Sequence, residues 1–410
     1  MGLLVVKFGG SSVATIEKIK SIADKVAAMQ AEGNQVVVVV SAMGDTTDEL
    51  IGLAGATGDQ AWHREMDMLL ATGEQQSAAL LAMTLNNRGT PAVSLTGWQA
   101  GIHSDDTHSK ARIVSIANGR ILQELKQGNV VVIAGFQGLS PQGDITTLGR
   151  GGSDTTAVAL AASLSADRCI IFTDVDGVYT ADPRIVPDAH NMSMVSYAEM
   201  LEMASLGAVV MQPRAVECAM HNQVEVEVRH SFKNDTGTLI TEVDKMEKQR
   251  VVSGVAHDTN VARIAIFDVP DRPGVASLLF NKLAQQGINV DMVIQSAMRE
   301  NRNDIAFTIE KADLNKAIPV VEEVVRELGA SGLSYDADVA KVSIVGAGMQ
   351  SHPGVAAKMF EALAEEGINI HMISTSEIRI SCLIDEDLIN KAVRALHAKY
   401  DLGNGNGGCC

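Results

Sequence analysis

Apolar runs alternate with amphipathic stretches along the first 240 residues. The runs VVKF, VVVVVS, VVVIAGF and CIIF have the composition of buried β-strands. Between them lie longer segments with apolar residues three and four apart, such as IEKIKSIADKVAAM and REMDMLLATGEQQSAALLAMTLNN, which predict helices. Buried strands separated by helices are typical of an α/β domain with a mostly parallel sheet. We expect this domain to cover residues 1–245.

The second half of the chain contains an internal repeat. The segments PGVASLLFNKLAQQGINVDM and PGVAAKMFEALAEEGINIHM are identical at 11 of 20 positions, with an offset of 80 residues. Each predicts a turn, an amphipathic helix and a second turn into a strand, which is the start of a βαββαβ unit. We expect two such ferredoxin-like units, over 250–335 and 336–402, followed by a flexible tail over 403–410.

Polar loops follow four of the predicted strands in the first domain. Their sequences are KFGGSS, SAMGDTTDEL, TTLGRGGSD and TDVDGVYTADPR. Ligands of such sheets collect at the carboxyl ends of the strands, so we expect one site there. In the third loop, glycines let backbone amides approach an anion, and Arg150 can bind a carboxylate through two hydrogen bonds. Ser153 or Asp154 is expected to cap the following helix.

Composition narrows the class of protein further. The chain has 410 residues and a net charge of -17, from 50 acidic and 33 basic side chains. This balance argues against a nucleic-acid or anionic-membrane surface. No apolar stretch approaches the roughly 20 residues that span a bilayer, and the chain starts directly with a strand-like segment, so we expect a cytoplasmic protein. Metal-ligand spacing is absent among Cys169, Cys218 and Cys382, which favours reduced thiols. The glycine-rich tail that ends in Cys409 and Cys410 is expected to be disordered.

Six motifs in a fixed order resemble those of bacterial aspartate kinases, which belong to the amino acid kinase superfamily. They are KFGGSSV, SAMGDTTDEL, TGEQ, GFQG, TTLGRGGSDTTAVALAA and TDVDGVYTADPR. The resemblance spans nearly the whole chain, and the repeat resembles paired ACT domains. It implies a three-layer αβα kinase domain, with ATP and Mg²⁺ as cofactors, that phosphorylates the β-carboxylate of L-aspartate. That reaction is the first step of lysine, threonine and methionine biosynthesis.

The resemblance also implies roles for individual residues. Lys7, Arg150 and Asp174 are expected to be catalytic. The residues expected to bind aspartate are Thr47, Glu74, Arg150 and Ser153. The residues expected to bind ATP are Lys7, Gly9, Gly10, Ser41, Thr173, Asp174, Tyr179, Asp182 and Arg184. Lys7 lies at a strand end beside glycines, where an ammonium suits phosphate, although the spacing is not that of a Walker loop.

The paired ACT units imply feedback regulation, with lysine and threonine as effectors. The residues expected to form the effector pocket are Asp271, Gly274, Ala276, Asn289 and Gln295 from the first unit and Val355, Asn369 and Ile370 from the second. The apolar side chains of the repeat, Phe280, Leu283, Phe360 and Leu363, are expected to serve packing. We expect a homo-oligomer held by ACT units, either alone or with an ACT-only subunit.

One departure from the family pattern keeps two alternatives open. Where the family commonly has lysine in a GAKV-like segment, this chain has Val209. We expect nucleotide affinity or turnover to be lower for lack of that charge. The alternatives are an amino acid kinase acting on another substrate, such as glutamate or acetylglutamate, and a catalytically weak regulator that senses amino acids. With no further domain expected after Leu402, the kinase is expected to be monofunctional.

Overall fold

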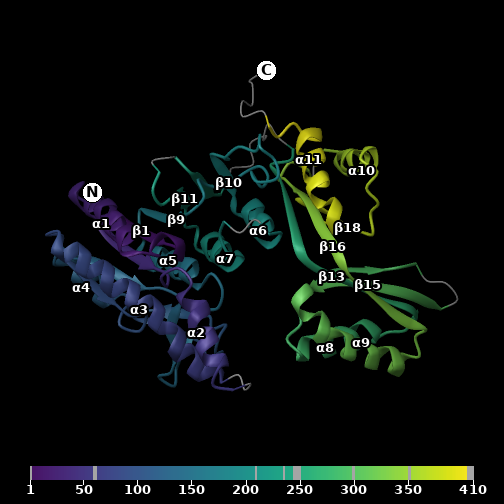
Figure 1. Cartoon of the computed structure of the whole chain (residues 1–410), viewed down its shortest axis with the longest axis horizontal. Helices are drawn as coiled ribbons and strands as arrows, with labels where there is room; N and C mark the ends of the chain where they lie inside the picture. The colour runs from purple at the N-terminus through teal and green to yellow at the C-terminus, as the bar shows by residue number, and fades with distance from the viewer. Residues whose placement is uncertain are drawn as a thin grey trace. The chain divides into compact units, whose positions relative to one another are not determined.

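The computed structural model describes residues 2–58, 62–207, 210–233, 236–242, 251–297, 301–349 and 352–403. Two compact units are present (Figure 1). The N-terminal unit comprises Met1–Val178 and Asn191–Lys245, and the C-terminal unit comprises Tyr179–His190 and Met246–Cys410. Val209, Cys409, Cys410 and the expected domain junction near residue 245 lie outside the described residues.

An eight-stranded sheet forms the centre of the N-terminal unit, in the order β10-β12-β11-β9-β1-β2-β6-β3. All neighbouring pairs are parallel except β11 with β12, so the predicted mostly parallel sheet is confirmed. Its strands are β1 (Leu3–Phe8), β2 (Gln35–Val40), β3 (Ala92–Leu95), β6 (Val130–Ala134), β9 (Arg168–Thr173), β10 (Met194–Ser196), β11 (Val226–His230) and β12 (Thr238–Thr241). The valines of β2 are buried on both faces, as expected for a strand covered by helices.

Seven helices accompany this sheet in the described part of the N-terminal unit. They are α1 (Ile16–Ala31), α2 (Thr46–Gly55), α3 (His63–Asn87), α4 (Gly119–Lys126), α5 (Gly152–Leu164), α6 (Tyr197–Ser205) and α7 (Pro213–Asn222). Apolar residues of α1 and α3, including Ile19, Ile22, Leu81 and Leu85, pack against the sheet in one core. A short sheet that the pattern did not predict contains β5 (Ile113–Ile116), β4 (Ile102–Ser104), β7 (Gln137–Leu139) and β8 (Ile145–Thr147).

The expected cap of α5 is wrong. Its N-cap is Gly151, and Ser153 and Asp154 lie inside the first helical turn. Gly151 has a φ of +70°, and a Cβ atom there would lie 1.7 Å from Cγ of Gln212. The backbone therefore needs glycine at the cap position, and the helix begins earlier than the polar residues suggest.

The C-terminal unit contains one antiparallel sheet in the order β14-β15-β13-β16-β18-β17. Its strands are β13 (Gly254–Pro270), β14 (Val290–Gln295), β15 (Arg302–Glu310), β16 (Gly332–Val345), β17 (Met372–Thr375) and β18 (Arg379–Asp385). Its helices are α8 (Val275–Gln285), α9 (Leu314–Leu328), α10 (Val355–Glu365) and α11 (Ile389–Lys399). The repeat thus reappears as α8 and α10, which begin at equivalent positions.

The two repeats share the long strands β13 and β16. The first repeat is β13-α8-β14-β15-α9-β16, which completes a βαββαβ unit. The second uses β16, α10, β17, β18 and α11, and its fourth strand is the beginning of β13, where Gly254 pairs with Val345. β16 therefore runs without interruption through the expected boundary between residues 335 and 336.

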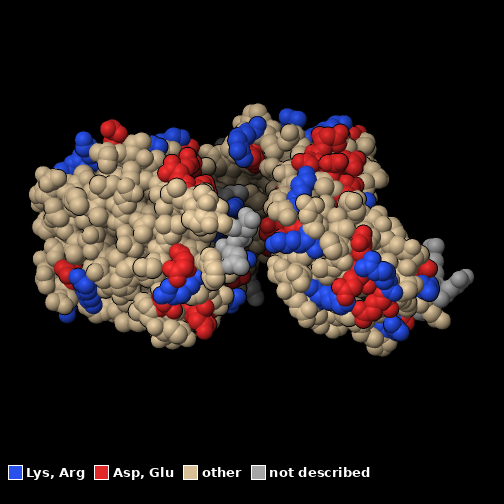
Figure 2. Space-filling model, turned by 60° about the horizontal axis from the view of Figure 1, so that its bottom comes forward, with Lys and Arg blue, Asp and Glu red and all other residues tan. Residues whose placement is uncertain are grey.

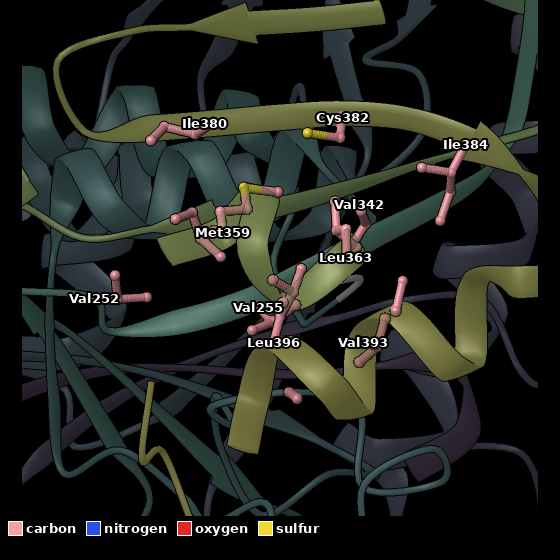
Figure 3. Packing of buried hydrophobic residues seen from close by; sticks show 14 of the residues in the cluster. Val252, Val255, Val342, Met359, Leu363, Ile380, Cys382, Ile384, Val393 and Leu396 are labelled. Carbon is pink, nitrogen blue, oxygen red and sulfur yellow. The ribbon is translucent and has the colours of Figure 1, made fainter. Parts of the chain in front are cut away.

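Each repeat has its own apolar core. Leu283 and Leu363 are fully buried in the first and second core, and Phe280 and Phe360 pack against them, as predicted. Figure 3 shows Leu363 among the side chains of the second core, together with Val393 and Leu396.

Residues 179–190 also belong to the second core, although they are far from it in sequence. Ala181 and Val186 are buried among its apolar side chains. The backbone NH of Val255 donates to the carbonyl of Thr180 at 2.8 Å, and the Thr180 hydroxyl lies 3.0 Å from Nε2 of the buried His397. These contacts fix the segment to the C-terminal unit.

The described surface carries both signs of charge in small mixed groups, as Figure 2 shows for one face. On the C-terminal unit, Lys282 lies 2.9 and 2.7 Å from the carboxylates of Glu323 and Glu327. The described cysteines are free thiols, and burial raises the pKa of Cys382 to about 12. None of the described helices is long and apolar enough to cross a membrane.

Candidate active site

A cavity of about 220 Å³ lies in the N-terminal unit. Because β9, β1, β2 and β6 are parallel neighbours, the loops after these strands leave the same edge of the sheet. The cavity is lined by Lys7 of β1, by residues that follow β1, β2, β6 and β8, and by one residue of α3. Seven of the lining residues were predicted from the sequence, namely Lys7, Gly10, Ser41, Thr47, Glu74, Arg150 and Ser153.

Lys7 forms the cationic side of this cavity. Its Nζ lies 2.6 Å from Oδ1 of Asp154, and both side chains are 10% exposed. Lys7 is near the end of β1 and Asp154 is in the first turn of α5, so the pair joins the sheet to the helix. Gly9 lies beside the ammonium, since a Cβ atom there would be in van der Waals contact with Nζ at 3.5 Å.

Glu74 forms the anionic side of the cavity. It lies in the middle of α3 and is 4% exposed. Its Oε1 accepts a hydrogen bond of 3.2 Å from the backbone NH of Ala42, whereas Oε2 is buried and has no hydrogen-bond partner among the described residues. Burial raises the pKa of Glu74 to about 7. An unpaired buried carboxylate oxygen at a cavity is suited to a cationic ligand group.

Arg150 and Ser153 lie on the glycine loop between β8 and α5. Arg150 is exposed, and Ser153 is buried at the start of α5. Added Cβ atoms on Gly135 and Gly152 would lie 2.8 Å from Ser153 Oγ and Leu148 Cβ, respectively. The loop therefore approaches its neighbours more closely than a residue with a Cβ atom would allow. Its backbone and the Arg150 side chain both line the cavity.

Thr173 is the last residue of β9, the neighbour of β1, and Asp174 follows it. The Thr173 hydroxyl donates to Oδ1 of Asp174 at 3.0 Å, and the Thr173 carbonyl accepts from the backbone NH of Ser231 at 2.8 Å. The backbone NH of Gly9 donates to the carbonyl of Phe172 at 3.3 Å. The Gly9 bond joins the chain after β1 to β9, and the Ser231 bond joins β9 to the chain after β11.

Three residues predicted to bind ATP belong to the other unit. Tyr179, Asp182 and Arg184 lie on the segment 179–190 of the C-terminal unit. Arg184 donates to Asp182 Oδ2 at 2.7 Å, and this guanidinium lowers the pKa of Asp182. The Arg184 side chain is otherwise 88% exposed.

The predicted effector residues lie at turns, at strand ends and in the first turns of α8 and α10. Gly274 and Gly354 have φ values of +100° and +96° and cap α8 and α10. Val355 lines a cavity of about 350 Å³ in the second repeat. In the first repeat, Asn303 donates to Asp271 at 3.3 Å. The remaining positions are Ala276, Asn289, Gln295 and Asn369, which are exposed, and Ile370, which is half-buried.

Sequence reasoning missed several residues of the site. Asp154 was expected as a helix cap but forms the ion pair with Lys7. Phe136 lines the cavity from the loop after β6, inside the GFQG motif that carried part of the resemblance. Asp67 of α3 does not line the cavity, but it is fully buried two helical turns from Glu74, a periodicity that would have placed both on one face.

The described residues contain no cluster of three or more histidine, cysteine or acidic side chains that could hold a metal ion. Mg²⁺ in phosphoryl-transfer sites is held by substrate phosphates with one or two carboxylates, and does not require such a cluster. Asp174, exposed at the end of β9, is a carboxylate of the kind this arrangement uses.

Comparisons with known proteins show which families the two parts of the chain match. The model of the amino acid kinase family matches residues 2–230, and an ACT domain model matches 268–325 and 342–400. An aspartate kinase of Stutzerimonas stutzeri is 51% identical over 404 residues, which cover 98% of each chain.

Two structures of E. coli aspartokinase III are also similar. The complex with aspartate and ADP (R-state) has a TM-score of 0.81 and 25% identity, and the complex with lysine and aspartate (T-state) has 0.76 and 26%. Each alignment covers 97% of this chain and 99% of the other.

The fold and the charged cavity define a kinase of the amino acid kinase class that carries ACT domains. Within this class the chain belongs to the aspartate kinase family, with which it shares half its residues over nearly its full length.

Proposed function

We propose that this chain transfers the γ-phosphoryl group of ATP to the β-carboxylate of L-aspartate and forms β-aspartyl phosphate. The observation that carries the proposal is the cavity in which Lys7, Glu74 and Arg150 meet. Aspartate has one ammonium and two carboxylates, and the cavity has one unpaired carboxylate oxygen and two cationic side chains. The E. coli relative that binds aspartate and ADP supports the same pair of ligands.

Each end of aspartate has a partner of opposite charge in this proposal. Glu74 pairs with the substrate ammonium through its free Oε2, and Arg150 binds the α-carboxylate. Thr47 and Ser153 contribute hydroxyl groups from the same lining. The β-carboxylate is then left to face the nucleotide. A site that pairs both charged groups disfavours glutamate, since its longer side chain displaces the reacting carboxylate.

The chemistry needs charge stabilisation more than a general base. The aspartate β-carboxylate is ionised at neutral pH, because its pKa is about 3.9 in a free side chain. Both reactants are anions, so Lys7 and the glycine backbone offset their repulsion as the phosphoryl group passes between them. Mg²⁺, when bound to the phosphates, supplies additional positive charge.

The nucleotide site combines residues from several loops. Gly9, Gly10 and Ser41 provide backbone and hydroxyl contacts to phosphates near Lys7. Thr173 and Asp174 extend the site at the end of β9. Tyr179, Asp182 and Arg184 contribute from the segment 179–190, and Arg184 exchanges its Asp182 partner for phosphate.

The C-terminal unit senses amino acids in this proposal. Lysine and threonine are the effectors, bound by the predicted pocket residues of the two ACT repeats. The E. coli relative that binds lysine supports the first of these effectors. ACT repeats of neighbouring chains join the enzyme into a cytoplasmic homo-oligomer. Residues 1–245 then carry catalysis and residues 250–402 carry regulation.

A hydroxamate assay tests the proposal. Hydroxylamine traps acyl phosphates, so ATP with L-aspartate is expected to give aspartyl hydroxamate, and glutamate and acetylglutamate are expected to give none. Adding lysine, threonine or both is expected to lower the rate, since allosteric coupling usually amounts to about 1–3 kcal/mol. No hydroxamate from aspartate would refute the kinase assignment, and an unchanged rate with both effectors would refute the sensing assignment.

A further inference from the structure

We name the cavity of Lys7, Glu74 and Arg150 the aspartate cavity. A second cavity of the N-terminal unit adjoins it and is lined by cations. Its volume is about 270 Å³. The lining residues are Lys110, Arg112, Leu148, Gly149, Arg150 and Arg214. The two cavities share only Gly149 and Arg150, so Arg150 stands between them. We name this second cavity the arginine cavity.

Within the described residues, the cations of the arginine cavity have no acidic side chain as an ion-pair partner. No lining residue is acidic, and none of the four cations forms an ion pair with any residue that the structure describes. In contrast, Lys282 and Lys399 of the C-terminal unit each contact two glutamates. Four unpaired cations around one cavity are unusual in a chain of net charge -17, and they favour an anionic ligand.

Arg214 is held in place at one side of the cavity. Its guanidinium donates to the carbonyl of Leu148 at 2.5 Å and to the carbonyl of Ala111 at 2.8 Å. A guanidinium has five N–H donors, so further donors remain for a ligand. Arg214 lies in the first turn of α7, and its position is fixed before any ligand arrives.

The loop that carries Lys110 and Arg112 is also fixed by hydrogen bonds, which it makes to Asp67. Buried Asp67 accepts hydrogen bonds of 3.0 Å from the backbone NH of Ser109 and of 2.5 Å from the Thr147 hydroxyl. Its Oδ2 also lies 2.8 Å from Nδ1 of His108. The loop and the strand before Gly149 thus share one buried anchor, which sets the backbone positions of the cations.

We propose that the arginine cavity binds a phosphate-class oxyanion, either free or as the end of a small phosphorylated molecule, and that this anion weakens aspartate binding. Guanidinium groups match the oxygens of phosphate, and a tetrahedral dianion accepts hydrogen bonds on all sides. The inhibitory effect rests on the proposed role of Arg150. An anion in the arginine cavity lies on the other side of Arg150 from the aspartate cavity. It weakens binding of the substrate α-carboxylate, because the two negative charges repel across the shared guanidinium.

Calorimetry on the full chain without nucleotide tests the site itself. Inorganic phosphate and pyrophosphate are titrated at constant ionic strength into the wild type, into Lys110→Gln/Arg112→Gln and into Lys20→Gln/Lys126→Gln. The last variant removes the same charge from exposed positions on α1 and α4. The first variant is expected to bind at least tenfold more weakly, and the control is expected to match the wild type. Tighter binding of pyrophosphate would indicate a phosphorylated molecule, and equal binding would indicate free phosphate.

The site proposal is overturned if neither anion binds the wild type saturably, or if both double variants bind as the wild type does. Equal unfolding temperatures of the three proteins establish that the substitutions leave the fold intact. This result does not depend on kinase activity, so it stands apart from the proposed function.

Kinetics then test the coupling through Arg150. Phosphate is expected to raise the KM for aspartate several-fold in the wild type and in the control, and to leave it unchanged in Lys110→Gln/Arg112→Gln. Competition at the nucleotide site would instead raise the KM for ATP and would persist in that variant. Phosphate that binds in the calorimeter but leaves the aspartate KM of the wild type unchanged would overturn the coupling.

Discussion

At the scale of residues, two charged groups of the cavity, Lys7 and Glu74, are buried. Glu74 is the clearest case, because one of its oxygens is satisfied by Ala42 and the other has no partner among the described residues. Its pKa of about 7 lies above the ordinary value of 4.5, and desolvation is the main cause. In the proposed function, the residue that binds the substrate ammonium therefore titrates near neutral pH.

Because the pKa of Glu74 is raised, its ionised form lowers the free energy of unfolding at high pH. Between about pH 4.5 and 7 the folded state holds a proton that the unfolded state has lost, so stability falls as pH rises through this window. Glu74→Gln is expected to be more stable than the wild type at pH 8, by up to about 3 kcal/mol, and equally stable at pH 4.5. Denaturant unfolding at the two pH values measures this difference.

The same substitution should weaken catalysis. Without the carboxylate, the KM for aspartate is expected to rise at least tenfold, and kcat/KM is expected to lose its fall below about pH 7. Glu65→Gln, an exposed change on the same helix, serves as the control. A Glu74→Gln enzyme with the aspartate KM and pH profile of the wild type would refute the role of this residue.

Substitutions in the ion pair of Lys7 and Asp154 distinguish its contribution to stability from its contribution to catalysis. Lys7→Met leaves Asp154 buried without its counterion, which is expected to cost about 3–5 kcal/mol of stability and at least a hundredfold in kcat. Adding Asp154→Leu is expected to restore much of the stability but none of the activity. Unfolding curves and kcat for both proteins distinguish the two effects. Recovery of activity in the double variant would contradict a catalytic role for Lys7.

Val209 lies outside the described residues, so its effect is predicted from the sequence alone. Val209→Lys adds a cation of the kind that neutralises phosphate oxygens. The KM for ATP is expected to fall, or kcat to rise, relative to the wild type. Val209→Met, of similar length without charge, is the control. Unchanged kinetics of the lysine variant would show that other groups already supply this charge.

At the scale of elements, helix α3 connects the aspartate cavity with the loop beside it. Glu74 and Asp67 are seven residues apart, so two turns of the helix place them on the same face. Glu74 reaches the loop after β2, and Asp67 reaches the loop that begins after β4. One helix thereby fixes two polar loops relative to the sheet.

Asp67→Asn is expected to loosen the second of these loops. An amide cannot accept all the hydrogen bonds that the carboxylate accepts from Ser109, Thr147 and His108, and the loss is expected to cost about 1–3 kcal/mol. Hydrogen exchange of residues 105–112 is expected to speed up more than that of the rest of the unit. The same change in exchange in Glu65→Gln would exclude this explanation.

At the scale of the whole molecule, the chain does not divide into units in simple order. It leaves the N-terminal unit after Val178, contributes residues 179–190 to the core of the second repeat, and returns at Asn191. Three residues proposed to bind nucleotide lie on this segment. Packing of the second repeat therefore holds the segment that carries three residues proposed to bind nucleotide.

Val186→Ala tests this connection. The smaller side chain leaves a gap in the second core, and the change is expected to cost about 1 kcal/mol and to raise the KM for ATP. Val321→Ala makes the same change in the buried core of the first repeat and serves as the control. It is expected to cost similar stability with an unchanged KM for ATP. Equal KM values for ATP in the two variants would show that packing of residues 179–190 does not affect nucleotide binding.

The sequence by itself determined the type of each domain. Period-two and period-3.6 patterns report which faces are buried, so the strands at Leu3–Phe8 and Gln35–Val40 and the repeated helices were predictable. The cavity residues were predictable where they follow strands, because parallel strands end at one edge. The other cavity residues were predicted only from the order of the motifs. Glu74, which lies inside helix α3, is one of them.

Only the tertiary structure decided the contacts between distant segments. It showed that Asp154 pairs with Lys7, that the repeats share β13 and β16, and that residues 179–190 pack with α11. Periodicity describes which side of an element is buried but not which element covers it. Ion pairs, shared strands and the cations around Arg150 depend on that choice, which the folded chain makes through packing over long sequence distances.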